Sequence, residues 1–193
     1  MEDLAEQLTD PSRVATLSAA SLAGTLSASM IARVCEGALD TGASGKAEEG
    51  IREIRDKAIR QRRDLVTLID HSAVVDRLMA QPRSSRDPER LKELLFSSEI
   101  PYRIAVSCHT LMALSLKLLG RVGLKGIAEI GTASGLAFAA IVGSTTVART
   151  ALSEIDKEGQ TSPSLTREKA ERILREADAT RAHITERVLK HLP

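Results

Sequence analysis

The strongest constraint on the fold is a pair of nineteen-residue stretches that contain no charged side chain, Val14 to Ala32 and Ile130 to Ala148. Nineteen uncharged residues are close to the length of a helix that crosses a bilayer. The first stretch, however, contains six Ser and Thr hydroxyls, and the whole chain has a mean hydropathy of −0.09. Because the other segments are amphipathic, we expect both stretches to be buried helices of a soluble protein that makes no membrane contact.

Helical periodicity covers most of the chain, whereas runs of alternating apolar and polar residues, which are typical of strands, are nearly absent. Pro11, Pro88 and Pro101 each stand where a helix can begin, and Gly42, Gly45 and Gly123 stand near expected breaks. The short connections favour antiparallel neighbours and therefore an all-α, up-and-down bundle of about five to six helices. The expected helices cover residues 10–39, 46–80, 88–96, 101–123, 125–155 and 164–189.

The length of 193 residues suits a single domain, residues 1–193, with one sizeable core. Only 2% of the residues are aromatic, against 42% that are hydrophobic, so the core should be built from small and aliphatic side chains. Gly131 and Gly135, four residues apart, indicate that another backbone approaches this helix closely.

The charges are nearly balanced, because the chain contains 27 basic and 26 acidic side chains. This balance gives no electrostatic footprint for nucleic acid or for an acidic membrane. Cys35 and Cys108 are isolated thiols, and no signal-peptide pattern opens the chain, so we expect a reducing cytoplasm. The basic cluster from Arg52 to Arg63 alternates with carboxylates, which is typical of a solvated, salt-bridged face; the alternative is a funnel for a polycarboxylate.

Two polar positions inside apolar surroundings are candidates for chemistry. His71 lies in the triplet Asp70, His71 and Ser72, between two apolar pairs, and an imidazole there can serve as a general acid or base that Asp70 or Ser72 orients. The alternative is that Asp70 accepts a local hydrogen bond and His71 faces solvent. Glu129 is a charge beside a long apolar stretch; it is either a buried functional carboxylate or one that complements a helix N-terminus.

Metal and nucleotide sites are not expected. A helical metal site requires two histidines three or four residues apart with a carboxylate on the same face of the helix, and no two of the four histidines have this spacing. The chain contains neither a GxGxxG nor a GxxxxGK phosphate-binding loop.

Four segments resemble one family along nearly the whole chain: Pro11-Ser12 before a helix rich in Ala, Ser and Leu, then LIDHSAVVDRLMA, IPYRIAVSCHTLMAL and GLKGIAEIGTASGLAFAA. They look like the formiminotetrahydrofolate cyclodeaminase and methenyltetrahydrofolate cyclohydrolase family. The resemblance implies an all-α bundle that dimerises and that opens or forms the methenyl bridge of tetrahydrofolate. It implies a tetrahydrofolate derivative as the substrate, with no covalently bound cofactor.

The resemblance also assigns residues. The family's Pro-Gly-Gly-Gly-Ser turn falls on residues 14–18, where only Ser18 is kept and three glycines have gained side chains. The family's Asp-Glu-Asp-Ala stretch falls on residues 69–72, so His71 replaces an aspartate or, with one gap, Asp70 keeps the first aspartate and Ser72 replaces the second. Its Asn-x-Asn-x-x-Ser-Asp falls on residues 123–129, which places Lys125 at an asparagine and Glu129 at the aspartate.

Two functional hypotheses follow from these residues. In the first, the chain is a dimeric folate-dependent cyclohydrolase or cyclodeaminase in which Asp70, His71 and Glu129 are catalytic and Ser18, Ser72 and Lys125 bind substrate. In the second, the chain is a helical subunit or ligand-binding module derived from the family that has lost this chemistry. Turnover of methenyltetrahydrofolate, and the presence of His71 and Glu129 in one cavity, distinguish the two hypotheses.

Overall fold

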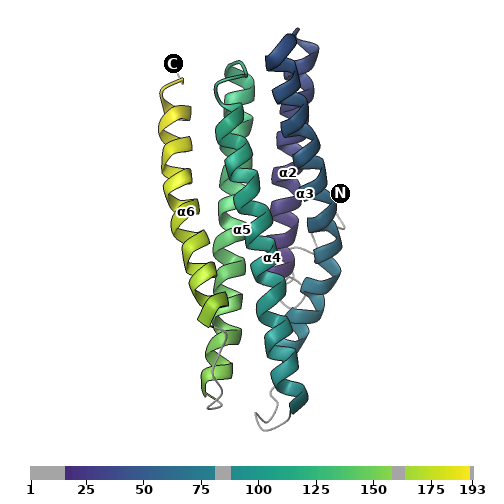
Figure 1. Ribbon diagram of the computed structural model, residues 1–193, viewed down its shortest axis with the longest axis vertical. Helices are drawn as coiled ribbons and strands as arrows, with labels where there is room; N and C mark the ends of the chain where they lie inside the picture. Colours follow the sequence, from purple (N-terminus) through teal and green to yellow (C-terminus); the bar gives the residue numbers. More distant parts are fainter. Residues whose placement is uncertain (1–15, 81–87, 158–163, 192–193) are drawn as a thin grey trace, which may run out of the picture.

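The computed structural model describes residues 16–80, 88–157 and 164–191, and within these ranges every secondary-structure element is a helix. Five helices follow one another along the chain with alternating directions, as Figure 1 shows. This is the all-α, up-and-down arrangement that the sequence predicts. The helices are α2 (Thr16–Asp40), α3 (Gly45–Ala80), α4 (Pro88–Leu118), α5 (Leu124–Lys157) and α6 (Ser164–Leu189).

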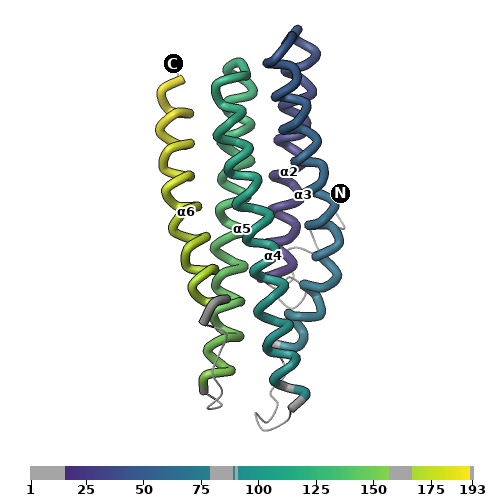
Figure 2. Tube along the Cα trace, viewed as in Figure 1, coloured from purple at the N-terminus to yellow at the C-terminus, as the bar shows by residue number. Residues whose placement is uncertain are grey.

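Helices α2 to α5 form a four-helix core, in which each helix packs against its neighbours in the order α2, α3, α4, α5 and α5 also packs against α2. Helix α6 packs on α4 and α5 and lies at the edge of the molecule, as the tube in Figure 2 makes clear. The turns between α2 and α3 and between α4 and α5 lie at the same end of the bundle (Figure 2). That end carries the pocket described below.

The core contains aliphatic and small side chains, as the low aromatic content predicts. Leu17, Ile31, Leu65, Leu111 and Met112 are among the largest fully buried residues. Alanines on every helix fill the remaining space, so the helices approach closely.

Two glycines permit the turn between α2 and α3. Gly42 and Gly45 have φ angles of 96° and 58°, in the left-handed region that side chains with a Cβ rarely adopt. The turn is further fixed by the Thr41 N–H, which donates to the Gly37 carbonyl at 3.2 Å, and by the Gly42 N–H, which donates to the Leu39 carbonyl at 3.2 Å. The break expected between these helices is therefore confirmed.

The prediction of separate helices over residues 88–96 and 101–123 is wrong, because α4 is continuous from Pro88 to Leu118 with Pro101 inside it. A proline within a helix has no N–H for the carbonyl four residues earlier and costs about 3 kcal/mol or more. Here Ile100 and Ile104, on either side of Pro101, are at most 2% exposed. Burial of such neighbours on the same core offsets the local cost, so the count is five helices and not six in the described part of the chain.

In the described part of the chain, helices α2 and α5 are long and apolar enough to cross a membrane, by length and composition alone. In this structure both lie in the four-helix core, where α2 packs on α3 and α5, and α5 packs on α2, α4 and α6. Even so, only 50% of the most apolar 18-residue segment of α2 and 39% of the corresponding segment of α5 are buried. A substantial uncharged surface on these two helices therefore remains exposed.

Residues 10–15 of the first expected helix, and the connectors at 81–87 and 159–163, lie outside the described residues.

Candidate functional site

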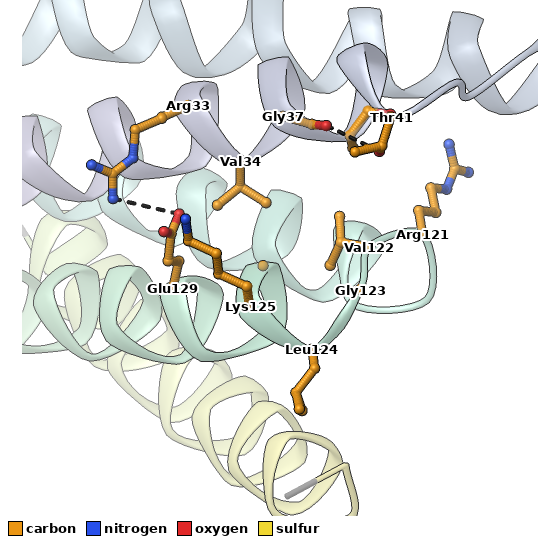
Figure 3. A pocket seen from close by; sticks show the side chains of 12 residues that line it. Arg33, Val34, Gly37, Thr41, Arg121, Val122, Gly123, Leu124, Lys125 and Glu129 are labelled. Carbon is orange, nitrogen blue, oxygen red and sulfur yellow. Dashed lines mark hydrogen bonds and ion pairs between the residues drawn. The ribbon is translucent and has the colours of Figure 1, made fainter.

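A pocket of about 700 Å³ opens between the second half of α2 and the turn that leads from α4 into α5. Figure 3 shows its polar side chains, which come from both helices and from the turn. Arg33 belongs to α2, and Thr41 directly follows that helix. Arg121 belongs to the turn between α4 and α5, and Lys125 and Glu129 belong to the first turns of α5. A volume in this range accommodates a small organic ligand.

Glu129 forms an ion pair across the pocket. The Arg33 guanidinium lies 3.4 Å from the Glu129 carboxylate, and Figure 3 shows the two side chains meeting between α2 and α5. The glutamate side chain is 24% exposed and the arginine side chain 66% exposed. Glu129 is therefore neither an unpaired buried carboxylate nor only a complement to the helix N-terminus; it is a partly buried carboxylate tied to a cation.

Two further cations line the pocket without an ion pair to any residue in the described ranges, Arg121 and Lys125. Figure 3 shows Lys125 extending beside Glu129 and Arg121 extending away from it, toward α3. The guanidinium of Arg121 occupies the space beside Gly50 where a Cβ atom would stand. The pocket thus carries three cations and one carboxylate, an arrangement that attracts an anionic ligand.

A second polar cluster lies at the start of α2, where Asp76 of α3 caps the helix. Its carboxylate accepts hydrogen bonds from the Ser18 N–H at 3.1 Å, from the Ser18 hydroxyl at 2.9 Å and from the Leu17 N–H at 3.4 Å. The first N–H groups of a helix have no partner within the helix, and a carboxylate also complements the helix dipole there. Ser18 is consequently occupied by a structural contact.

Ser72 is fully buried and takes part in the same junction between α2 and α3. Its hydroxyl lies 2.7 Å from the Ser21 hydroxyl, and it also donates to the Leu68 carbonyl at 2.6 Å. These bonds satisfy a polar group that would otherwise be costly in the core.

Asp70 and His71 are both exposed on α3. The His71 ring makes an edge-to-face contact with Phe96 of α4, with 6.4 Å between the ring centroids. No polar partner is found for either side chain among the described residues. Their arrangement agrees with the solvent-facing alternative for His71.

The predicted site residues therefore fall into two groups. Glu129 and Lys125 share the pocket, while Ser18, Ser72, Asp70 and His71 lie around the other end of α2. Ser21 beside Ser72 and Arg33 beside Glu129 are twelve residues apart on α2, which corresponds to about 18 Å at 1.5 Å per residue. His71 does not line the pocket that contains Glu129.

Sequence reasoning missed Arg33, Arg121 and Asp76. Arg33 is the first charge after the uncharged stretch of α2, and Asp76 is the next carboxylate after the polar triplet, so each carried a weak signal. What identifies them is the pairing between helices, which a single sequence does not display.

The two thiols lie in the core and not in the pocket. Cys35 and Cys108 are free and buried, and desolvation raises the pKa of each to about 12. Such thiols remain protonated and unreactive near neutral pH. In the described ranges no three His, Cys, Asp or Glu side chains gather as metal ligands do.

Five up-and-down helices with a cationic pocket at one end define an all-α helical bundle with a site of small-molecule size. Residues 18–172 match the formiminotransferase-cyclodeaminase family, and the chain belongs to that family, as the resemblance in its sequence predicted. The match includes every predicted site residue and ends in the first third of α6. A comparison with curated proteins gave no match.

Proposed function

We propose that this chain is a folate-binding member of its family and that the pocket between α2 and α5 holds the ligand. The observation that carries the proposal is the set of three cations, Arg33, Arg121 and Lys125, around one opening of about 700 Å³. A tetrahydrofolate derivative has a flat pterin and a carboxylate-bearing tail, and it needs both uncharged wall and positive charge. Val34, Val122 and Gly126 supply the uncharged wall.

The cations of the pocket can bind the carboxylates of the ligand's tail. Arg121 and Lys125 have no ion pair among the described residues, so either can bind an anion without breaking an ion pair, although Arg121 would have to turn away from Gly50. The Arg33 guanidinium forms an ion pair with the Glu129 carboxylate at 3.4 Å and helps to hold that carboxylate in place. A charge-assisted hydrogen bond from arginine to a carboxylate is among the stronger polar contacts a pocket can offer.

A second candidate function, catalysis of methenyl-bridge hydrolysis or cyclisation, is favoured by one observation: Glu129, which the resemblance assigns to the family's aspartate, lines the pocket. A carboxylate there can accept a proton from the water that attacks the bridging carbon. Asp70 and His71 lie about 18 Å away along the bundle and have no access to that carbon within one subunit. We therefore propose ligand binding as the first candidate function. In the second candidate function, Glu129 is the catalytic residue.

Two buried free thiols suit a reducing compartment, so we also propose a cytoplasmic location.

The decisive experiment follows methenyltetrahydrofolate in its ultraviolet band while the same preparation is titrated with tetrahydrofolate in a calorimeter. Saturable binding that Lys125→Ala weakens by about tenfold, the equivalent of 1.4 kcal/mol for one charged contact, supports the pocket. Ala113→Ser on the exposed surface of α4 is the matched control and should leave binding unchanged.

Turnover that Glu129→Gln abolishes while binding persists supports the enzyme. Absence of both binding and turnover refutes the folate proposal in either form.

A further inference from the structure

Two residues that line the pocket between α2 and α5 have no side chain and face open space. A Cβ added at Gly37 of α2, or at Gly123 of the turn before α5, would meet nothing within 4 Å. Gly126 differs from them, because a Cβ there would lie 3.0 Å from the Val122 Cβ and 3.3 Å from Val34. Since Gly37 and Gly123 both line the pocket, the open space in front of them is continuous with it.

The two glycines lie opposite each other across the pocket. Helices α2 and α5 run in opposite directions, and the close approach of Val34 and Gly126 fixes their register at this end. Gly37 lies three residues after Val34, and Gly123 lies three residues before Gly126, so the two glycines are at the same height. Figure 3 shows Gly37 on α2 and Gly123 in the turn opposite it. We call the space between these two residues the glycine slot.

The backbone does not explain why either position is a glycine. Gly37 and Gly123 lack the positive φ angles that Gly42 and Gly45 have. No close neighbour excludes a side chain at either position. Glycine inside a helix lowers its stability relative to alanine, so the glycine at position 37 is unfavourable for α2 itself. What the two residues contribute is therefore room in the pocket.

Gly37 lies at the centre of the wall that α2 gives to the pocket. Arg33, Gly37 and Thr41 follow one another at steps of four residues and therefore share one face, with Val34 and Ala38 beside them. A longer side chain at position 37 would extend between Arg33 and Thr41 and into the glycine slot. Position 37 therefore limits the width of a ligand group that can lie against this wall.

The charged side chains lie next to the glycine slot and not inside it. Lys125 is two residues after Gly123, and Arg33 is about one helical turn before Gly37. A flat, uncharged ring fits between two stretches of backbone without side chains, and an anionic group attached to that ring meets the cations beside it. The pocket thus offers separate places for the two halves of such a ligand.

We propose that the glycine slot holds the flat ring of the ligand and that Gly37 determines the width of ring that the pocket accepts. This inference rests on the proposed function, because it places the pterin of a folate in the slot and the carboxylates of the tail beside Lys125 and Arg33.

Two fragments of the ligand test this division of the pocket. Saturation-transfer NMR titrations measure the binding of 6-methylpterin, which is the ring alone, and of p-aminobenzoylglutamate, which is the tail alone. Gly37→Leu should weaken the binding of 6-methylpterin and of tetrahydrofolate by at least about tenfold and leave that of p-aminobenzoylglutamate unchanged. Lys125→Ala should weaken p-aminobenzoylglutamate and leave 6-methylpterin unchanged.

Ala113→Leu, on the exposed surface of α4, is the matched control and should bind all three compounds as the unmodified protein does. Gly37→Leu should unfold at the same temperature or higher, because leucine is a better helix former than glycine. A loss of ring binding is then an effect of the pocket and not of unfolding.

A thiol at position 37 tests the same inference without filling the slot. The native thiols are buried with their pKa raised to about 12, so the thiol of Gly37→Cys is the reactive one. It should react with a maleimide, and saturating 6-methylpterin should slow that reaction by at least about tenfold if the ring covers the thiol in most molecules. The thiol of Ala113→Cys should react without protection.

Tetrahydrofolate binding that Gly37→Leu leaves unchanged, or a Gly37→Cys thiol that 6-methylpterin does not protect, overturns the inference and leaves the proposed function in place. No binding of tetrahydrofolate or of either fragment by the unmodified protein refutes the proposed function and the inference together.

Discussion

Gly24 is the position where a single added methyl group should be least tolerated. It lies in the first half of α2 and is buried, and a Cβ there would stand 2.7 Å from the Cys108 Sγ and 3.1 and 3.3 Å from the two Leu65 Cδ atoms. Both neighbours are fully buried, so neither has free space to move into. Helices α2, α3 and α4 meet closely at this point because residue 24 has no side chain.

The size of the effect follows from two opposing contributions. Replacing glycine by alanine inside a helix stabilises it by about 1 kcal/mol. Overpacking a well-filled core costs about 1–3 kcal/mol, and a contact of 2.7 Å to an enclosed sulfur belongs at the upper end. We therefore expect Gly24→Ala to lower the free energy of unfolding by about 2 kcal/mol, or the Tm by about 4–8 °C for a chain of this size.

Thermal and urea unfolding followed by circular dichroism at 222 nm measure this change. Gly37→Ala is the matched control in the same helix, since its Cβ would meet nothing within 4 Å. That variant should be equally stable or more stable, by up to about 1 kcal/mol. A Gly24→Ala protein as stable as the unmodified one would refute the reasoning.

A double-mutant cycle assigns the cause. In a Cys108→Ala background the sulfur is gone, so Gly24→Ala should cost at least about 1 kcal/mol less than in the unmodified protein. Additive effects of the two substitutions would mean that the clash with Cys108 is not the source of the instability.

Three other predictions test the remaining contacts. Asp76→Ala removes the cap of α2 and should destabilise the fold by about 1–2 kcal/mol in urea, whereas an unchanged midpoint would show that the cap is dispensable. Arg33→Ala releases Glu129 and should weaken tetrahydrofolate binding by about tenfold by calorimetry; equal affinity would remove Arg33 from the site. Burial raises the pKa of Cys35 and Cys108 to about 12, so the folded state holds protons that the unfolded state loses above about pH 9. Stability should therefore fall as the pH rises from about 9 to 12, and a Cys35→Ala, Cys108→Ala protein with the same slope would contradict this cause.

The fold was predictable from the sequence where the apolar spacing and the turn residues agree. The break after Asp40 is marked by Gly42 and Gly45, whose positive φ angles explain why glycine is needed there. The boundary assigned to Pro101 failed because local propensity was taken to decide it. Burial of Ile100 and Ile104 on a common core outweighs the missing hydrogen bond, and that burial depends on the tertiary structure.

The candidate site was predictable only in part, because it depends on which residues of different helices are level with one another. Glu129 and Lys125 lie on one helix, and their spacing of four places them on one face. The partner Arg33 comes from α2, about a hundred residues earlier, and nothing in the chain near it specifies the register. The same reason separates His71 from Glu129, since each appeared suitable alone and only the bundle sets the distance between them.

The carboxylate of Asp76 has a consequence for the motions of the bundle. Its hydrogen bonds connect the start of α2 to the end of α3, and the turn with Gly42 and Gly45 connects the same two helices at their other ends. The pair of helices is therefore held together at both ends. A hairpin held in this way should open as one cooperative unit, with amide protons of α2 and α3 exchanging at similar free energies. Helix α6, which lies at the edge of the bundle and packs mainly on α4 and α5, should exchange its amide protons first.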